Sequence, residues 1–125
     1  MSTLYYPIMY LDDNDFQGDK LVLPNNLQNQ KNVVVMLQTS WCPHCTDAKP
    51  AFQEFAEKYQ DKIICATIQP DGDTQEEKNL GDRIKQIVPD FRGFPDYCLF
   101  VNGKRDKSRK IESRDVAGLV AFANL

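Results

Sequence analysis

Two cysteines separated by two residues, Cys42 and Cys45, form the arrangement in this sequence best suited to chemistry. The apolar run 33–37 precedes them and apolar residues at helical spacing follow them, so the pair is predicted where a buried strand leads into a helix. Residues three apart share a helix face, which lets the two sulfurs approach bonding distance. Unpaired N–H groups and the helix dipole favour a thiolate at the helix start. We therefore expect Cys42 to be the nucleophile of a redox-active dithiol and Cys45 to be the resolving thiol.

The residues between and after the two cysteines bear on the same chemistry. His44 is the only histidine of the chain, and its positive charge beside Cys42 would stabilise the thiolate and make the disulfide more oxidising. Pro43 suits the first helical turn, where its missing N–H loses no hydrogen bond. Pro50 lies inside the predicted helix, where we expect it to remove one hydrogen bond and bend the axis.

The other two cysteines, Cys65 and Cys98, lie within apolar, strand-like runs. Buried free cysteine behaves as a small hydrophobic residue, so we assign both a structural role. Neighbouring strands could also bring them together in a regulatory or second disulfide, and the sequence leaves this alternative open. A zinc site would need a second pair of thiolates at suitable spacing, so no metal is expected and a metal-binding C-x-x-C module is the weaker alternative.

Length and composition restrict the kind of protein. With 125 residues, 42% hydrophobic and 26% charged, the chain is predicted to form one globular domain over 1–125, in which 1–32 has the least regular pattern. A net charge of −3 gives no reason to expect nucleic acid or a membrane as partner. The first residues lack the features of a secretory signal, so we expect a cytoplasmic protein, acting as a monomer.

The elements that must position the dithiol follow from periodicity and turn signals. The expected order is a strand within 5–11, a turn at 12–16, strands at 33–37 and 63–68, helices from Pro43 and over 80–88, a hairpin of 97–101 and 104–111, and a last helix capped by Ser113. The hairpin turn is Asn102-Gly103. This order predicts an α/β fold with a central mixed sheet of four to five strands and helices on both faces.

Several residues around the dithiol carry a family resemblance. They are Trp41 directly before Cys42, Pro50 five residues after Cys45, the run Arg92-Gly93-Phe94-Pro95, and the closing hairpin and helix. Over roughly 33–125 the sequence resembles the thioredoxin superfamily and implies its fold. The resemblance further implies that Pro95 is cis beside the dithiol, that it keeps metal from the cysteines, and that the Phe94 backbone binds extended substrates. Trp41, Pro43, Phe94 and Pro95 would then form the substrate surface.

The tetrapeptide Cys-Pro-His-Cys is similar to the bacterial oxidase branch of that superfamily, and its His44-Cys45 half to protein disulfide isomerase domains. This implies a dithiol more oxidising than that of thioredoxin. Met36 stands where the family usually buries an acid, and the usual lysine partner aligns best with Cys65 or a neighbour, so we expect Cys45 to lose its proton slowly or to water. Asp96 would oppose thiolate formation if it points toward the dithiol.

The resemblance and the residues together predict a thiol–disulfide oxidoreductase that exchanges disulfides with proteins through a mixed disulfide. It would need no cofactor, and a reductase or glutathione would supply electrons if it works as a reductant. The alternative from another class is a binding or chaperone-like module whose redox turnover is residual, which Met36 favours.

Overall fold

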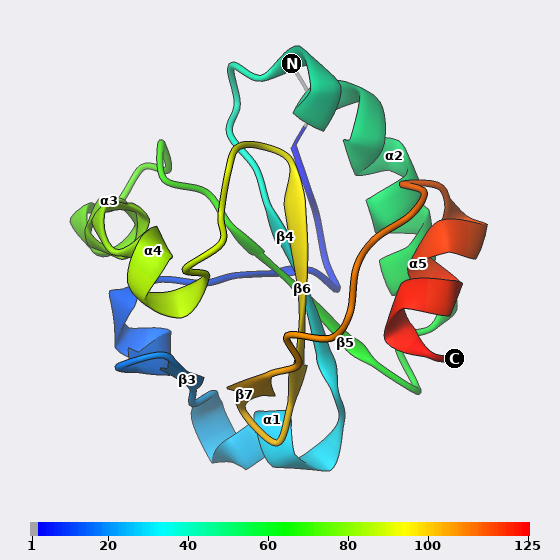
Figure 1. The fold of residues 1–125 in the computed structure, drawn as a ribbon, viewed down its shortest axis with the longest axis horizontal. Coiled ribbons are helices and arrows are strands. Elements are labelled where there is room, and N and C mark those ends of the chain that lie inside the picture. The colour runs from blue at the N-terminus through cyan, green and yellow to red at the C-terminus, as the bar shows by residue number, and fades with distance from the viewer. Residues whose placement is uncertain (1–2) are drawn as a thin grey trace.

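The computed structural model describes residues 3–125, which are built around a mixed five-stranded sheet (Figure 1). The strand order is β1-β5-β4-β6-β7. The strands are β1 Met9–Tyr10, β4 Val33–Leu37, β5 Ile64–Ile68, β6 Asp96–Val101 and β7 Lys104–Arg105. β1, β5 and β4 run parallel, and β6 and β7 are antiparallel to their neighbours. The predicted α/β class and mixed sheet are confirmed.

β4 is the centre of the sheet, and every one of its residues is buried. Because side chains alternate along a strand, Val34 and Met36 join one hydrophobic core while the other three residues join a second core on the opposite face. The unbroken apolar run that predicted this strand thus reflects a sheet covered on both sides.

Helices lie on both faces of the sheet (Figure 1). α2, Pro43–Lys58, and α5, Val116–Ala123, pack together and contribute to the core that holds Met36. α3, Gln75–Asp82, and α4, Ile84–Ile87, contribute to the other core. This arrangement confirms the predicted helix layers and leaves the start of α2 at one end of β4.

The region before β4 contains only short elements. They are the 3-10 helices η1 Asp13–Asp15 and η2 Pro24–Asn26, the hairpin of β2 Phe16–Gln17 and β3 Lys20–Leu21, and α1 Leu27–Gln30. Asp12 caps η1, as its position in the predicted turn suggested, with its carboxylate accepting the Asn14 N–H at 2.8 Å. The predicted strand within 5–11 is shorter than expected: only Met9 and Tyr10 pair, after a turn that contains the cis Tyr6–Pro7 peptide.

The helix predicted over 80–88 is wrong in extent and continuity. α3 begins earlier, because Thr74 caps it by accepting the Glu77 N–H at 3.1 Å. Arg83 then separates α3 from α4 with a non-helical ψ of 25°. Its guanidinium pairs with Asp13 and donates to the Gly18 carbonyl at 2.8 Å, so a contact distant in sequence accompanies the break.

The closing hairpin is confirmed at its turn and corrected in its length. Asn102 and Gly103 both have positive φ, 51° and 80°, as a tight hairpin turn requires. The returning strand was predicted to reach residue 111 but ends at Arg105, since Asp106 turns the chain by accepting the Ser108 N–H at 3.0 Å.

The last helix is capped by Asp115, which corrects the prediction of Ser113. The Asp115 carboxylate accepts the Gly118 N–H at 2.7 Å. Within residues 3–125 none of the helices combines the length and the apolar character needed to span a membrane.

Candidate active site

Cys42 occupies the N-cap position of α2, and its sulfur serves as the capping acceptor. The Cys45 N–H donates to the Cys42 Sγ at 3.2 Å, and Pro43 follows as the first helical residue. An N–H directed at the sulfur, at the positive end of a 16-residue helix, stabilises negative charge there. The strand-to-helix junction predicted for the dithiol is where the structure places it.

Cys45 lies one turn further into α2 and is fully buried, at 0% exposed, whereas 5% of Cys42 is exposed. Both thiols are free. Burial, followed by the contact with Cys42, raises the pKa of the Cys45 thiol to about 11. Both thiols are thus buried, but a small part of Cys42 reaches solvent whereas Cys45 is fully enclosed by protein.

The loop before β6 lies against the outer thiol. The Phe94–Pro95 peptide is cis, and the Cys42 thiol donates to the Phe94 carbonyl at 3.7 Å. The Phe94 ring meets Trp41 edge-on, with ring centroids 6.2 Å apart, and Phe91 at 5.0 Å. Trp41 is 68% exposed, so an exposed aromatic surface lies beside the Cys42 sulfur.

The remaining predicted site residues differ in their placement. His44 and Pro43 are exposed on the first turn of α2, and among residues 3–125 no hydrogen bond or ion pair joins the His44 side chain to another group. Pro50 lies inside α2, as predicted.

Asp96 is half-buried, and burial raises the pKa of its carboxyl group. Its carboxylate accepts the Tyr97 N–H at 2.8 Å. The charges that act on Asp96 come from Arg105, Asp90 and Lys110 rather than from the dithiol.

Cys65 and Cys98 cannot form the disulfide that the sequence left open. Cys65 is on β5 and Cys98 on β6, with β4 between them, and the two thiols belong to cores on opposite faces of the sheet. Burial raises the pKa of each to about 12. Within residues 3–125 no group of three or more His, Cys, Asp or Glu side chains is arranged to hold a metal ion.

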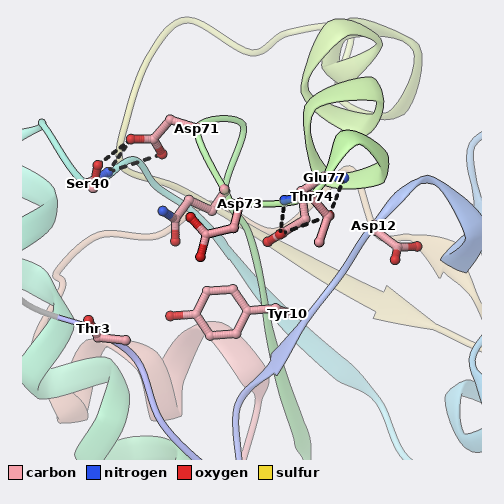
Figure 2. Close-up of a pocket in the computed structure, with 10 residues that line it drawn as sticks. Thr3, Tyr10, Asp12, Ser40, Asp71, Asp73, Thr74 and Glu77 are labelled. Carbon is pink, nitrogen blue, oxygen red and sulfur yellow. Dashed lines mark hydrogen bonds between the residues drawn. The ribbon is translucent and has the colours of Figure 1, made fainter.

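Asp71 anchors the active-site loop, a role that the sequence analysis missed. The Ser40 N–H donates to its two carboxylate oxygens at 3.1 and 3.3 Å, and the Ser40 hydroxyl donates to it as well (Figure 2). Although burial acts to raise it, the bonds from Ser40 hold the pKa of Asp71 below its usual range. Asp71 follows β5 and Ser40 follows β4, and the carboxyl ends of parallel strands share a sheet edge. That rule could have predicted the contact.

Beside this anchor lies an open cavity of about 590 Å³, which Figure 2 shows with carboxylates of Asp12, Asp71, Asp73 and Glu77 around it. The cysteines are not among the residues that line it. The cavity flanks the active-site loop without containing the reacting sulfurs.

Met36 stands six residues before Cys42, fully buried on β4, and pairs with Thr67 of β5 and Tyr97 of β6. Thr67, rather than Cys65, is therefore the residue opposite Met36, and its hydroxyl donates to the Met36 carbonyl at 2.8 Å. Two buried polar residues were also not predicted as part of the site: Lys49, which interrupts the apolar face of α2, and Tyr97, which follows the cis-proline loop.

Comparison with known proteins finds relatives of this chain by sequence. The family model described as Thioredoxin matches residues 12–124. The chain is 41% identical over 127 residues to the thioredoxin-like protein 453L of Invertebrate iridescent virus 6, covering 93% of this chain and 91% of that protein. It is 32% identical over 100 residues to protein disulfide-isomerase of Aspergillus oryzae, covering 77% of this chain but only 17% of that enzyme.

A solved structure gives the same result for the fold. Thioredoxin f from spinach chloroplast superposes with a TM-score of 0.64 at 18% identity, covering 99% of this chain and 96% of that one.

Proposed function

Because the chain belongs to the thioredoxin family, we propose that it is a protein thiol–disulfide oxidoreductase working through Cys42 and Cys45. The observation that carries the proposal is the Cys42 sulfur at the start of α2, held by the Cys45 N–H at 3.2 Å with the second thiol one turn behind. This is the geometry that thiol–disulfide exchange needs, since a stabilised thiolate attacks and a neighbouring thiol completes the reaction.

The reaction proceeds in two exchanges. The Cys42 thiolate attacks one sulfur of a substrate disulfide; a mixed disulfide forms, and the other substrate sulfur leaves with the bonding electron pair and takes up a proton. Cys45 then attacks the Cys42 sulfur, forms the Cys42–Cys45 disulfide, and releases the second substrate thiol. Reversing these steps oxidises a substrate dithiol instead.

The substrate surface is proposed to be the aromatic rim of Trp41 and Phe94 together with Pro43 and Pro95. Trp41 and Pro43 are exposed, and the Phe94 backbone lies against the Cys42 sulfur, so an extended peptide that reaches the sulfur must pass along this loop. Proteins with accessible disulfides or dithiols are the substrates that fit such an open surface. A reductase or glutathione would return electrons to the pair.

We further propose that the dithiol is more oxidising than that of thioredoxin. His44 follows the N-cap by two residues, and a positive charge there stabilises the reduced, thiolate form relative to the disulfide. The support is the position of the exposed His44 on the first turn of α2, two residues after Cys42.

Trapping of the mixed disulfide tests the function. Cys45→Ser retains the attacking sulfur and removes the resolving one, so after incubation with a protein rich in disulfides, such as insulin, it should carry a covalent adduct that a reductant releases. Cys42→Ser is the matched control and should carry none.

The unmodified protein should also reduce insulin disulfides faster than an equal concentration of free dithiol. A folded Cys45→Ser variant without adducts, together with a rate no higher than that of free dithiol, would contradict the proposal and favour a binding module, the reading that an apolar Met36 supports.

A further inference from the structure

The resolving thiol has to carry negative charge in a place that water does not reach. Cys45 is fully buried, and its attack on Cys42 requires the thiolate. An isolated buried charge is strongly unfavourable unless nearby groups compensate for it. The fully buried Met36 offers no such group, so the groups that compensate must be sought among the other neighbours of the Cys45 sulfur.

Lys49 is the one charged residue on the buried face of α2. It follows Cys45 by four residues, which places both on the same side of the helix, and it is only 3% exposed. Lysine is almost never buried to this extent without a partner for its charge. The Lys49 Nζ donates to the Thr39 carbonyl at 3.5 Å, and the Thr39 backbone also hydrogen-bonds to the Cys45 sulfur. The ammonium and the inner thiol thus converge on one residue of the loop that leads to Cys42, and the charge of Lys49 lowers the pKa of Cys45 against the effect of burial.

Tyr97 lies on β6, in the hydrophobic core that α2 also contributes to. It is the cross-strand neighbour of Met36, is 4% exposed, and its ring packs edge-on against Phe52 of α2 with centroids 6.1 Å apart. Its buried hydroxyl has no hydrogen-bond partner among residues 3–125. Burial above all, and also a negative charge on Cys45, raises the pKa of Tyr97 to about 12, so the hydroxyl keeps its proton and is available as a donor.

We propose that Lys49 and Tyr97 stabilise the Cys45 thiolate during resolution, Lys49 as a counter-charge and Tyr97 as a hydrogen-bond donor. This inference rests on the proposed function: within that reaction, Lys49 and Tyr97 are positioning residues that act through Cys45. The proton of Cys45 passes to water, and Lys49 and Tyr97 keep theirs. The thiolate then attacks the Cys42 sulfur of the mixed disulfide, the Cys42–Cys45 bond forms, and the substrate sulfur leaves with the electron pair and is protonated by water.

The groups whose charge or hydrogen bonds act on Cys45, or on which Cys45 acts, come from three places. Cys42 and Lys49 belong to α2, the Thr39 backbone to the loop after β4, and Tyr97 to β6. Asp96 and Arg114 act on Tyr97. A change in the pH dependence of resolution can therefore be traced to these groups by substitution.

The test follows the two exchanges separately. Reduced protein reacts with dithionitrobenzoate in two phases, the first releasing one coloured thiol as Cys42 attacks and the second releasing another as Cys45 resolves. Lys49→Met removes the charge and keeps an apolar side chain of similar length. It should leave the first phase unchanged, slow the second about tenfold near neutral pH, and raise its pH midpoint by about one unit. Tyr97→Phe removes only the hydroxyl and should slow the second phase about threefold.

Lys62→Met, which removes an exposed lysine beyond the end of α2, is the matched control and should behave as the unmodified protein does. Second-phase rates and pH midpoints in Lys49→Met and Tyr97→Phe that equal those of the control would overturn the inference and leave the proposed function intact. An unmodified protein without a second phase would instead contradict the proposed function, and this inference with it.

A direct titration separates the ionisation of the thiol from the exchange rates. The ¹³Cβ signal of Cys45 should titrate at a lower pH in the unmodified protein than in Lys49→Met. Titration at the same pH in the two proteins would show that the charge of Lys49 does not stabilise the thiolate and would overturn the inference.

Discussion

His44 is the residue of the dithiol motif whose side chain lies open to solvent. Because no group within residues 3–125 hydrogen-bonds to the imidazole, His44 can act on Cys42 only through its charge, and water and salt screen that interaction. The effect on the reduction potential should therefore be small and should depend on ionic strength.

His44→Ala should make the protein more reducing, by about 30 mV or less at low salt, because removal of a positive charge destabilises the thiolate form. The difference should shrink at high salt, which screens the charge. Equilibration with glutathione buffers measures both potentials, with Lys62→Ala as a control that should show no change. Equal potentials for His44→Ala and the unmodified protein at low salt would show that His44 does not make the dithiol more oxidising.

Lys49 shows why parts of the site escaped prediction at this scale. A lysine in an amphipathic helix is normally assigned to the solvent face, yet this one falls at the helical spacing of Cys45 and Phe52 and is buried with them. Cys42 and Cys45, by contrast, could be predicted because their spacing alone brings the sulfurs together on a helix. A charged residue at a buried position interrupts the apolar pattern from which the buried face of a helix is predicted.

Elements with strong periodicity were predicted well, and elements decided by distant contacts were not. β4 and the N-terminal boundary of α2 agree with their apolar patterns. The break at Arg83 coincides with its pairing to Asp13, seventy positions away, which no local pattern reports. The short β7 reflects the turn at Asp106, whose side chain competes for backbone N–H groups.

The link between the loops after β4 and β5 carries a stability prediction. The pKa of Asp71 is lower in the folded protein than its ordinary value, so its stabilising effect is present above about pH 4 and is lost as the pH falls through the folded value. Asp71→Ala should lower the free energy of unfolding near neutral pH by about 1 kcal/mol, a figure reduced for solvent screening because the carboxylate is partly exposed.

Urea unfolding at several pH values measures this difference, which should fade as the pH falls below the ordinary pKa of a carboxyl group and Asp71 becomes protonated. The neighbouring exposed Asp73 offers the matched control, Asp73→Ala, which should change stability little. A difference for Asp71→Ala that persists unchanged at low pH would show that the carboxylate charge is not what holds Ser40.

At the scale of the molecule, β4 joins the two hydrophobic cores. Its alternating residues belong to both, so one core cannot lose its packing without exposing the strand that supports the other. We therefore expect residues 1–125 to unfold as one cooperative unit, which is the single domain predicted from the sequence.

Cys65 and Cys98 report on the two cores separately, because each thiol is buried in one of them. In native buffer both should resist alkylation, and with rising urea both should become labelled at the same rate, as mass spectrometry of the digested protein can measure. Labelling of one cysteine well before the other would mean that its side of the sheet opens independently.

The chain's single tryptophan, Trp41, stands largely in water directly beside the reacting sulfur. Any client seated over the dithiol must cover this indole and replace its hydration with peptide. The fluorescence emission of Trp41 should then shift to shorter wavelength. Binding of unlabelled protein substrates can therefore be followed by the intrinsic fluorescence of the protein.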